Sequence, residues 1–371
     1  MRVGVPSEVK NHEYRVAITP AGVQELVGHG HDVIVEAGAG LGSSITDAEF
    51  AAAGAAIAPG PEQVWGDAEM IVKVKEPVAA EYGRLRPGQV LFGYLHLAAN
   101  RDCTHALLDR KVTGIGYETV QSPSGRLPLL APMSEVAGRL APQVGAYHLM
   151  RQGGGRGTLM GGVPGVHPAK VVVIGAGVAG MNAAAIALGM QAEVLLLDDD
   201  VDRLAEADKI YQGRLQTIAS NAFEIERAVR DADLVIGAVL VSGAKAPTVI
   251  SNELVARMKP GSVLVDVSID QGGCFEDSRP TTHAEPVYMV HDSVFCCVAN
   301  MPGMVSYTST YALTNATLPY TLKLADHGWK AACQADPVLA PGLNTHDGEV
   351  TNAAVAHAHE LAHRPLADVL D

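Results

Sequence analysis

Short runs of apolar residues alternate with helix-like segments along the first third of the chain. Five of these runs predict buried strands, in the order RVGVP, HDVIVEAG, MIVKVKE, VLFGYLHLA and VTGIGYET. The segments between them begin with residues that cap helices, such as Thr19 before Pro20, and Asn100 at the head of NRDCTHALLDRK. Strand–helix–strand alternation implies parallel strands joined by crossover helices, so the pattern predicts an α/β fold.

A second α/β series begins at Lys170. It follows a proline-rich break, LPLLAPM, then a helical pattern that starts at Ser134, and then the glycine tract GGGRGTLMGGVPGVHP. The predicted strands of this series are VVVIGAG, EVLLLD, RLQTIAS, DLVIGAVL, SVLVDVSID and VFCCVAN. A helical C-terminal segment begins near ANMPGMVSYTSTYALTNATLPY. Because 371 residues exceed one ordinary core, the two series predict two domains.

Composition and charge narrow the class of protein. The chain is 48% hydrophobic and 18% charged with 39 glycines, which fits an α/β enzyme. Its formal net charge of -14 argues against nucleic acid or an anionic membrane surface as a partner. It has no apolar run of about 18 residues and no signal-peptide core, so we expect a cytoplasmic protein. Without zinc-like or C-x-x-C spacing, five cysteines are expected to be buried free thiols: Cys103, Cys274, Cys296, Cys297 and Cys333.

The segment VVVIGAGVAGMNAAAIALG carries the pattern G-x-G-x-x-G between a predicted strand and an alanine-rich helix. Gly175 allows a tight turn, Gly177 a close approach of the backbone to a pyrophosphate, and Gly180 close packing of helix on strand. Asp198 ends the next strand, where a carboxylate binds the adenosine ribose and repels a 2′-phosphate. NAD is therefore the predicted cofactor, although an arginine such as Arg203 is how NADP enzymes hold that phosphate. The alternative is a Rossmann fold that has lost its cofactor.

Two aspartates lie in the run VLVDVSIDQGG, which reads as a buried strand leading into a glycine turn. Asp270 stands where the strand should end, and Asp266 lies within it. A strand-end carboxylate alone is as common in a turn as in a catalytic site. In doubly wound sheets, however, ligands bind outside the carboxyl ends of the strands. We therefore expect Asp270 to point toward the nicotinamide and Asp266 to be structural.

The chain resembles bacterial alanine dehydrogenases from Met1 to about Trp329, because seven motifs occur in that family's order. These are RVGVPSEVKNHEYRVAITPAGV, VKVKEP, LFGYLHLA, APMSEVAGRLA, VVVIGAGVAG, LVDVSIDQGG and VANMPG. The resemblance implies two Rossmann-like doubly wound domains with an active-site cleft between them. Residues 1–128 and 307–371 would form the substrate domain, and residues 129–306 the NAD-binding domain. It also implies reversible conversion of L-alanine, NAD⁺ and water into pyruvate, ammonium and NADH.

The resemblance assigns four residues to the chemistry of oxidative deamination. Arg15 would anchor the substrate carboxylate, because a guanidinium forks onto a carboxylate through two parallel hydrogen bonds. Lys75, rather than Lys73 on the same predicted strand face, would polarise the pyruvate oxygen. His96 would pass a proton to and from the carbinolamine oxygen, since an imidazole titrates near neutral pH. Asp270 would be the second acid–base residue, opposite His96.

Further cofactor contacts, a metal site and an assembly are also implied by the resemblance. Glu118 and His327 match a divalent-ion position of some relatives and would bind Mg²⁺, although one carboxylate and one imidazole are few ligands for a hard cation. Relatives assemble as hexamers, which implies a homohexamer. Besides the glycine loop, Asp198, Arg203 and Asp270, the residues expected to contact NAD are Ser134, Val178, Ala179, Ser220, Val239, Leu240, Val267, Ser268, Ile269, Arg279, Val298, Ala299, Asn300 and Met301.

Three alternatives to this function remain at the level of sequence. A non-catalytic NAD sensor would keep the glycine loop but lose the cleft residues, whereas Arg15, Lys75, His96 and Asp270 are all present. A transhydrogenase subunit would favour a longer chain or membrane-spanning partners. A related dehydrogenase could act on glycine and glyoxylate or on a longer amino acid, since the sequence does not size the substrate pocket. The resemblance fades after about Asp336, and His357 and His359 of the tail are expected to be solvated.

Overall fold

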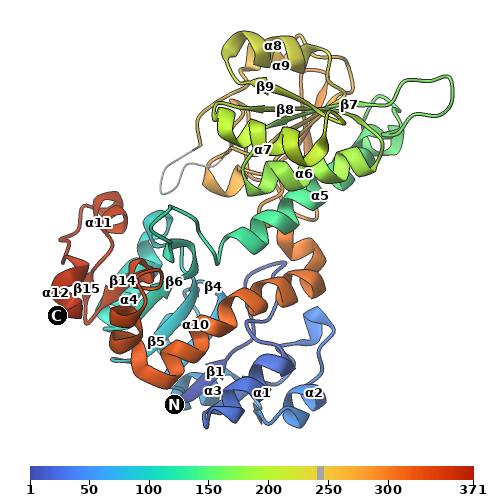
Figure 1. Ribbon diagram of the computed structural model, residues 1–371. Helices are drawn as coiled ribbons and strands as arrows, with labels where there is room; N and C mark the ends of the chain where they lie inside the picture. The colour runs from blue at the N-terminus through green and yellow to red at the C-terminus, as the bar shows by residue number, and fades with distance from the viewer. Residues whose placement is uncertain (240–245) are drawn as a thin grey trace. The chain divides into compact units, whose positions relative to one another are not determined.

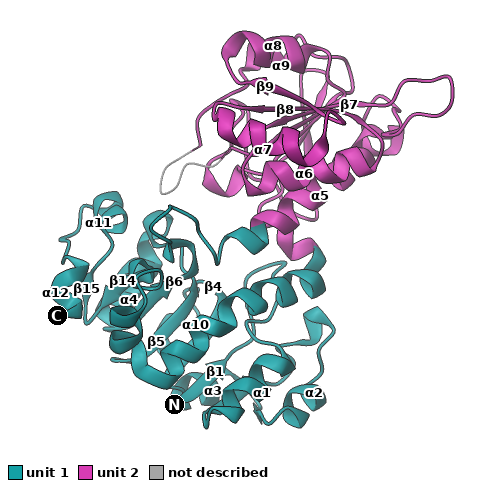
Figure 2. Ribbon diagram, viewed as in Figure 1, with its two compact units in different colours: residues 1–133, 305–371 teal, residues 134–304 magenta. Residues whose placement is uncertain are grey.

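The computed structural model describes residues 1–239 and 246–371, so the predicted cofactor residue Leu240 lies outside the described residues. The chain forms two compact units (Figure 2). Unit 1 comprises Met1–Met133 and Val305–Asp371, and unit 2 comprises Ser134–Met304. The chain crosses from one unit to the other within helix α5 (Ala131–Leu149) and within the 3₁₀ turn η7 (Met301–Val305).

Unit 1 is built on an eight-stranded sheet in the order β15-β14-β6-β5-β4-β1-β2-β3 (Figure 1). Strands β1 to β6 are parallel, and β14 and β15 extend one edge antiparallel. The order of the parallel strands is that of a doubly wound Rossmann-like sheet. The strands are β1 (Arg2–Val5), β2 (Asp32–Glu36), β3 (Ala56–Ala58), β4 (Met70–Lys75), β5 (Val90–Tyr94), β6 (Thr113–Gly116), β14 (Leu343–His346) and β15 (Glu349–Val350).

Two helices of unit 1 begin at the capping residues that the sequence predicts. The Thr19 side chain accepts a hydrogen bond from the N–H of Gly22 and precedes Pro20 in the first turn of α1. The Asn100 side chain accepts from the N–H of Cys103 at the start of α4. Both predicted caps are therefore confirmed. The helices are α1 (Pro20–Gly28), α2 (Asp47–Ala52), α3 (Pro61–Asp67), α4 (Arg101–Asp109), α10 (Ser306–Ala335), α11 (Ala353–His359) and α12 (Leu366–Leu370), with 3₁₀ turns η1 (Leu41–Ser43), η2 (Tyr82–Arg84), η3 (Leu97–Ala99), η4 (Tyr117–Thr119) and η8 (Ala340–Gly342).

Unit 2 repeats the same strand order in a seven-stranded sheet, β12-β13-β11-β10-β7-β8-β9 (Figure 1). Six strands are parallel, and β12 pairs antiparallel with β13 at one edge. Its elements are β7 (Lys170–Ile174), α6 (Val178–Gly189), β8 (Glu193–Asp198), α7 (Val201–Tyr211), β9 (Gln216–Ala219), α8 (Ala222–Arg230), β10 (Leu234–Gly237), α9 (Asn252–Val255), β11 (Val263–Asp266), β12 (Val287–Val290) and β13 (Ser293–Cys296), with 3₁₀ turns η5 (Arg151–Gly153) and η6 (Ile269–Gln271). The predicted fold, two Rossmann-like units of the α/β class, is confirmed.

The apolar runs that predict strands form the buried cores. In unit 2, Val172, Leu197, Val235, Leu264 and Phe295 come from five parallel strands and pack in one cluster, each at most 3% exposed. Four strands were not predicted, namely β3, β12, β14 and β15. They have two to four residues and mixed burial, so their sequences carry little of the continuous apolar signal of a central strand.

Two sequence-based expectations about the chain as a whole can be compared with the structure. All five cysteines are free and buried, as predicted. Within the described ranges, no helix is long and apolar enough to cross a membrane.

In each sheet, the first three parallel strands are added toward one edge and the next three toward the other edge, so the strand order reverses at one point. It lies between β1 and β4 in unit 1 and between β7 and β10 in unit 2. Loops leaving the carboxyl ends of the strands diverge at such a point, and doubly wound proteins bind ligands there. The loops after these strands are therefore where functional side chains are expected.

Candidate active site

The loop after β7 fits a dinucleotide pyrophosphate. Gly175 has a φ of +103°, and a Cβ on it would lie 2.4 Å from the carbonyl oxygen of Ala238. Gly180, in the first turn of α6, packs so closely that a Cβ would lie 1.7 Å from the carbonyl oxygen of Gly175. A Cβ on Gly177 would meet nothing within 4 Å among the described residues, so a ligand can approach the backbone there. This open loop at the N-terminus of α6 suits the pyrophosphate of NAD.

Asp198 is fixed beside this loop. It ends β8, is 5% exposed, and accepts hydrogen bonds from the N–H groups of Ala176 (2.5 Å) and Asp200 (2.8 Å). Arg203 of α7 lies 3.7 Å from Asp198 and 3.4 Å from Asp200. The guanidinium of Arg203 is therefore engaged with two carboxylates. The carboxylate of Asp198 would repel a 2′-phosphate on the ribose, which favours NAD over NADP.

Most of the other predicted cofactor residues follow the carboxyl ends of parallel strands in unit 2. Ser220 follows β9, and its N–H donates to the carbonyl oxygen of Asp198 at 2.8 Å. Ser268 follows β11, and its hydroxyl donates to the carbonyl oxygen of Val239, after β10, at 2.8 Å. The same sheet edge carries Val178 and Ala179 after β7, Val267 and Ile269 after β11, and Val298, Ala299, Asn300 and Met301 after β13. The two predicted residues that do not directly follow a strand are Ser134, in α5, and Arg279, whose guanidinium lies 3.9 Å from the centre of the Tyr288 ring.

The two aspartates of VLVDVSIDQGG have different environments. Strand β11 ends at Asp266, so the strand is shorter than predicted and Asp270 lies in the 3₁₀ turn η6. Asp266 is fully buried and accepts from the N–H of Ser268 (2.9 Å) and from the hydroxyl of Ser278 (2.5 Å). Burial raises the pKa of Asp266. Asp266 therefore has the structural role predicted, because it closes the loop that carries Asp270. Asp270 itself is exposed and accepts from the N–H of Asn300 at 3.2 Å.

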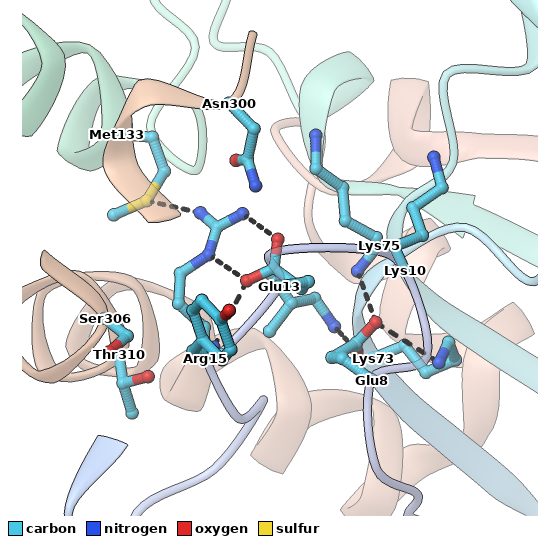
Figure 3. A network of polar contacts seen from close by, with 12 residues as sticks. Glu8, Lys10, Glu13, Arg15, Lys73, Lys75, Met133, Asn300, Ser306 and Thr310 are labelled. Carbon is cyan, nitrogen blue, oxygen red and sulfur yellow. Dashed lines mark hydrogen bonds and ion pairs between the residues drawn. The ribbon is translucent and has the colours of Figure 1, made fainter. Parts of the chain in front are cut away.

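Arg15 lies in the loop after β1, within a network of charged residues (Figure 3). Its guanidinium is 2% exposed and forks onto Glu13, from Nε to Oε1 at 2.7 Å and from Nη2 to Oε2 at 2.6 Å. Nη1 lies 3.0 Å from Sδ of Met133. Burial alone would raise the pKa of Glu13, but the hydrogen bonds from Arg15 outweigh it and hold that pKa below its usual value. The two-bond fork that the sequence argument gave to a substrate is thus made with Glu13, which fixes the plane of the guanidinium.

Strand β4 carries both candidate lysines, but its register is irregular. Between Val72 and Lys75 the pairing with β5 advances three residues on β4 against two on β5, so Lys75 pairs with Tyr94. The prediction that Lys73 and Lys75 lie on one face of the strand, which assumed strict alternation, is therefore wrong. Lys73 is fully buried, and its Nζ lies 3.0 Å from Glu81, so it is structural, as predicted. Lys75 is partly buried, with Nζ 6.0 Å from the centre of the Tyr94 ring.

His96 follows β5 in a left-handed backbone conformation, with a φ of 47°. Its N–H donates to Oε1 of Glu118 at 2.6 Å, which holds a turn that a non-glycine residue rarely adopts. The side chain keeps 34% of its surface exposed. Burial, reinforced by the charges of Lys75 and Lys10, lowers the pKa of His96 to about 3. The imidazole is therefore neutral at pH 7, which is the form that can accept a proton.

Glu118 and His327 do not fit a site for a hard cation. The two oxygens of Glu118 accept the N–H groups of Leu95 (3.2 Å) and His96 (2.6 Å), and burial raises the pKa of this carboxyl. His327 is exposed, and in the parts of the chain that the structure describes no three His, Cys, Asp or Glu side chains gather in a metal-binding arrangement. Mg²⁺ prefers six oxygen ligands. The physical role of Glu118 is instead to hold the turn that carries His96.

Two contacts near His96 were missed in the sequence. Lys10 donates to Oε1 of the buried Glu76, and Oε2 of Glu76 lies 3.7 Å from Nδ1 of His96. His359 is only 8% exposed and donates through Nε2 to the carbonyl oxygen of Leu97 at 2.7 Å. The prediction that His359 is solvated is therefore wrong, whereas His357 is exposed as predicted. In the sequence, the contact of Glu76 with Lys10 and His96 is indicated only by the position of Glu76 directly after Lys75.

Arg15 and His96 lie in the loops after β1 and β5, and Lys75 is the last residue of β4. All three residues thus belong to the carboxyl edge of the sheet, near the point where the strand order of unit 1 divides. A buried guanidinium, a lysine and a neutral imidazole at one sheet edge suit a small carboxylate-bearing substrate that exchanges a proton. Together with the dinucleotide loop of unit 2, they define a nicotinamide-dependent dehydrogenase of small organic acids or amino acids.

Comparison with known proteins gives the family. Residues 4–137 match the N-terminal domain of the alanine dehydrogenase/PNT family, and residues 141–353 match its C-terminal domain. An alanine dehydrogenase from Mycobacterium tuberculosis is 66% identical over 356 residues, 96% of each chain, and one from Halomonas elongata is 58% identical over the full length of both. A solved L-alanine dehydrogenase superposes with a TM-score of 0.94 at 48% identity, covering 97% of this chain and 99% of that one. The chain belongs to the alanine dehydrogenase/PNT family.

A solved transhydrogenase from Sinorhizobium meliloti is more distant. It superposes with a TM-score of 0.81 at 26% identity, covering 95% of this chain and 100% of that one. The alanine dehydrogenases are therefore the branch of the family that this chain is most similar to among these proteins.

Proposed function

We propose that this protein is an NAD-dependent alanine dehydrogenase. The reaction is L-alanine + NAD⁺ + H₂O ⇌ pyruvate + NH₄⁺ + NADH + H⁺. The observation that carries the proposal is that Arg15, Lys75 and His96 lie at the carboxyl ends of β1, β4 and β5 in a chain whose other unit has the glycine loop and Asp198 of an NAD site. The relatives named alanine dehydrogenase support the same substrate.

The basic residues of unit 1 would bind the substrate. Arg15 anchors the substrate carboxylate, with Glu13 holding the guanidinium in one plane through its bonds of 2.6 and 2.7 Å. Lys75 polarises the 2-oxo oxygen, since an ammonium stabilises the charge that develops on that atom. Lys73 cannot replace it because its amino group is buried between Glu8 and Glu81.

The proton transfers would be divided between His96 and Asp270. His96, neutral at pH 7, takes the proton of the carbinolamine hydroxyl when pyruvate forms and returns it in the reverse direction. Asp270, exposed in η6, handles the proton of the water or ammonia. When bound, NAD supplies the hydride acceptor. The glycine loop and Asp198 of unit 2 are the residues that would hold it.

NADH oxidation in the presence of ammonium and a panel of 2-oxo acids tests this function. Pyruvate should give the highest kcat/KM, ahead of glyoxylate, 2-oxobutyrate and longer 2-oxo acids. Omission of ammonium should stop the reaction, because the amino group has no other source. A preference for glyoxylate or for a longer acid would move the chain to another substrate within the same chemistry.

We also propose that the protein is a cytoplasmic homohexamer. Unit 2 exposes an apolar hairpin in which Val163 pairs with Val166, at 55% and 63% exposure. Leu159, Tyr147 and Met150, close to it in the chain, are 45% to 59% exposed. Such apolar surface favours self-association, and five buried thiols suit a reducing compartment. Light scattering checks the assembly, which should have six times the mass of the 38.7 kDa chain.

A further inference from the structure

Two buried polar atoms that lie close together, one in the imidazole of His96 and one in the carboxylate of Glu76, have no hydrogen-bond partner in the part of the chain that the structure describes. Among the described residues, Nδ1 of His96 and Oε2 of Glu76 make no hydrogen bond, and they lie 3.7 Å apart. Native proteins pair nearly all buried polar atoms, so each exception calls for an explanation, and a catalytic role is one. One of these two atoms is a potential donor and the other a potential acceptor, and their separation of 3.7 Å suggests that each is the intended partner of the other.

Glu76 is held in place from its other side. Its side chain is 7% exposed, and its Oε1 accepts a hydrogen bond from Lys10. An ammonium only donates, so Oε1 is committed to Lys10 and Oε2 is the oxygen left for His96. The backbone of His96 is fixed as well, through the 2.6 Å bond from its N–H to Glu118. Side-chain rotation of the imidazole is then enough to shorten the remaining gap.

We propose that Glu76 is a positioning residue that accepts a hydrogen bond from Nδ1–H of His96. The bond keeps the proton of the neutral imidazole on Nδ1, so that Nε2 stays unprotonated and takes the proton of the substrate. Catalytic hydrogen bonds are often long in a free enzyme and shorten when the substrate binds. The inference rests on the proposed function, because it assigns a partner to the histidine that exchanges the proton there.

Glu76→Gln separates this role from a purely structural one. Lys10 still needs an acceptor, so the amide oxygen of the new side chain turns toward Lys10 and its NH₂ group faces Nδ1. Because NH₂ only donates, Nδ1 must accept and the imidazole proton moves to Nε2, which is the wrong tautomer for a base. Removing Lys10 as well lets the amide turn over and present its oxygen to Nδ1.

The experiment compares Glu76→Gln, Lys10→Met and the double variant in NADH oxidation with pyruvate and ammonium. Glu76→Gln should lower kcat at least about tenfold, while the Kd for NADH, the KM for pyruvate and the melting temperature stay near those of the unmodified protein. The double variant should recover kcat at least about threefold over Glu76→Gln, which a structural role does not predict. Glu81→Gln is the matched control, a buried glutamate bonded to Lys73 at 3.0 Å, and its kcat should change less than about twofold.

A kcat of Glu76→Gln close to normal, or a double variant slower than Glu76→Gln, would overturn the inference. An unmodified protein that does not aminate pyruvate would instead overturn the proposed function, so the two failures are distinguishable. Should Glu76→Gln not fold, ¹⁵N-histidine NMR of the unmodified protein decides, with His96→Asn used to assign the signal. A proton on Nδ1 supports the inference, and a proton on Nε2 contradicts it.

Discussion

Under the proposed function, Asp198 is the residue that decides which dinucleotide the protein accepts. Its carboxylate stands beside the glycine loop, and it keeps Arg203 3.7 Å away, engaged with carboxylates. NAD⁺ should therefore have a much higher kcat/KM than NADP⁺. Asp198→Ala removes the repulsion and releases Arg203 for a 2′-phosphate, so the ratio of the two kcat/KM values should narrow at least about tenfold.

Steady-state kinetics with both cofactors measures this ratio. Asp202→Ala serves as the control, since Asp202 is an exposed carboxylate in the first turn of α7, the helix that carries Arg203. It changes the local charge equally but leaves the ribose position intact. Similar kcat/KM values for NAD⁺ and NADP⁺ in the unmodified protein would contradict the assignment of Asp198.

Single residues could be predicted from sequence where their chemistry depends on close neighbours in the chain. The glycine loop and Asp198 belong to one strand–helix–strand unit, and their spacing is a local property. Glu76 and Lys10 are 66 positions apart, and His359 and Leu97 are 262 positions apart. No periodicity or motif length connects such pairs, so only the folded chain identifies them. Glu13 is only two positions from Arg15, but no sequence pattern distinguishes a guanidinium that forks onto a neighbouring carboxylate from one that forks onto a substrate.

At the scale of elements, the central strands were predicted well and their ends were not. Continuous apolar runs mark strands buried on both faces, and these runs are present in β1, β4, β5, β7 and β11. The run of β11 extends past its last pairing residue, because the loop after Asp266 is also buried. Strand β4 has one more residue than β5 between their paired positions, and a search for alternation with a period of two does not detect such an inserted residue.

The loop from β7 to α6 gives a prediction that separates folding from binding. A Cβ on Gly180 would lie 1.7 Å from the Gly175 carbonyl oxygen, whereas one on Gly177 meets no heavy atom within 4 Å among the described residues. Gly180→Ala should therefore lower the free energy of unfolding by about 2 kcal/mol or more, since backbone must move. Gly177→Ala should fold normally and bind NADH at least about tenfold more weakly, because its methyl group occupies the approach of the pyrophosphate.

Thermal unfolding and NADH fluorescence titration measure the two effects. Gly189→Ala, at the end of the same helix and with no described atom within 4 Å of its Cβ position, is the control and should lower neither the stability nor the affinity for NADH. If Gly177→Ala binds NADH with unchanged affinity, the loop does not cradle the pyrophosphate.

At the scale of the whole molecule, one strand order occurs twice, and under the proposed function each copy carries a different part of the chemistry. Unit 1 brings Arg15, Lys75 and His96 to the carboxyl edge of its sheet, and unit 2 brings the dinucleotide loop and Asp270 to the corresponding edge of its own. The repeated alternation of strands and helices predicts this architecture from sequence. The antiparallel additions β12, β14 and β15 could not be predicted, since short edge strands lack an apolar pattern of their own.

The division of acid–base residues between the units gives the last prediction. Under the proposed function, His96 and Asp270 both exchange protons in the reaction, so the chemistry should fail when either is lost, although each unit stays folded. General acid–base assistance is worth about 10²–10⁴-fold. His96→Ala and Asp270→Ala should therefore each lower kcat at least about a hundredfold, while fluorescence titration shows NADH binding retained. The double variant should fall little below the slower single variant, because both groups serve one proton path. Arg15→Lys should instead raise the KM for pyruvate, since a lysine keeps the charge beside Glu13 but not the fork. A His96→Ala protein with near-normal kcat would remove the proton-transfer role and leave that histidine a residue of the turn that Glu118 holds.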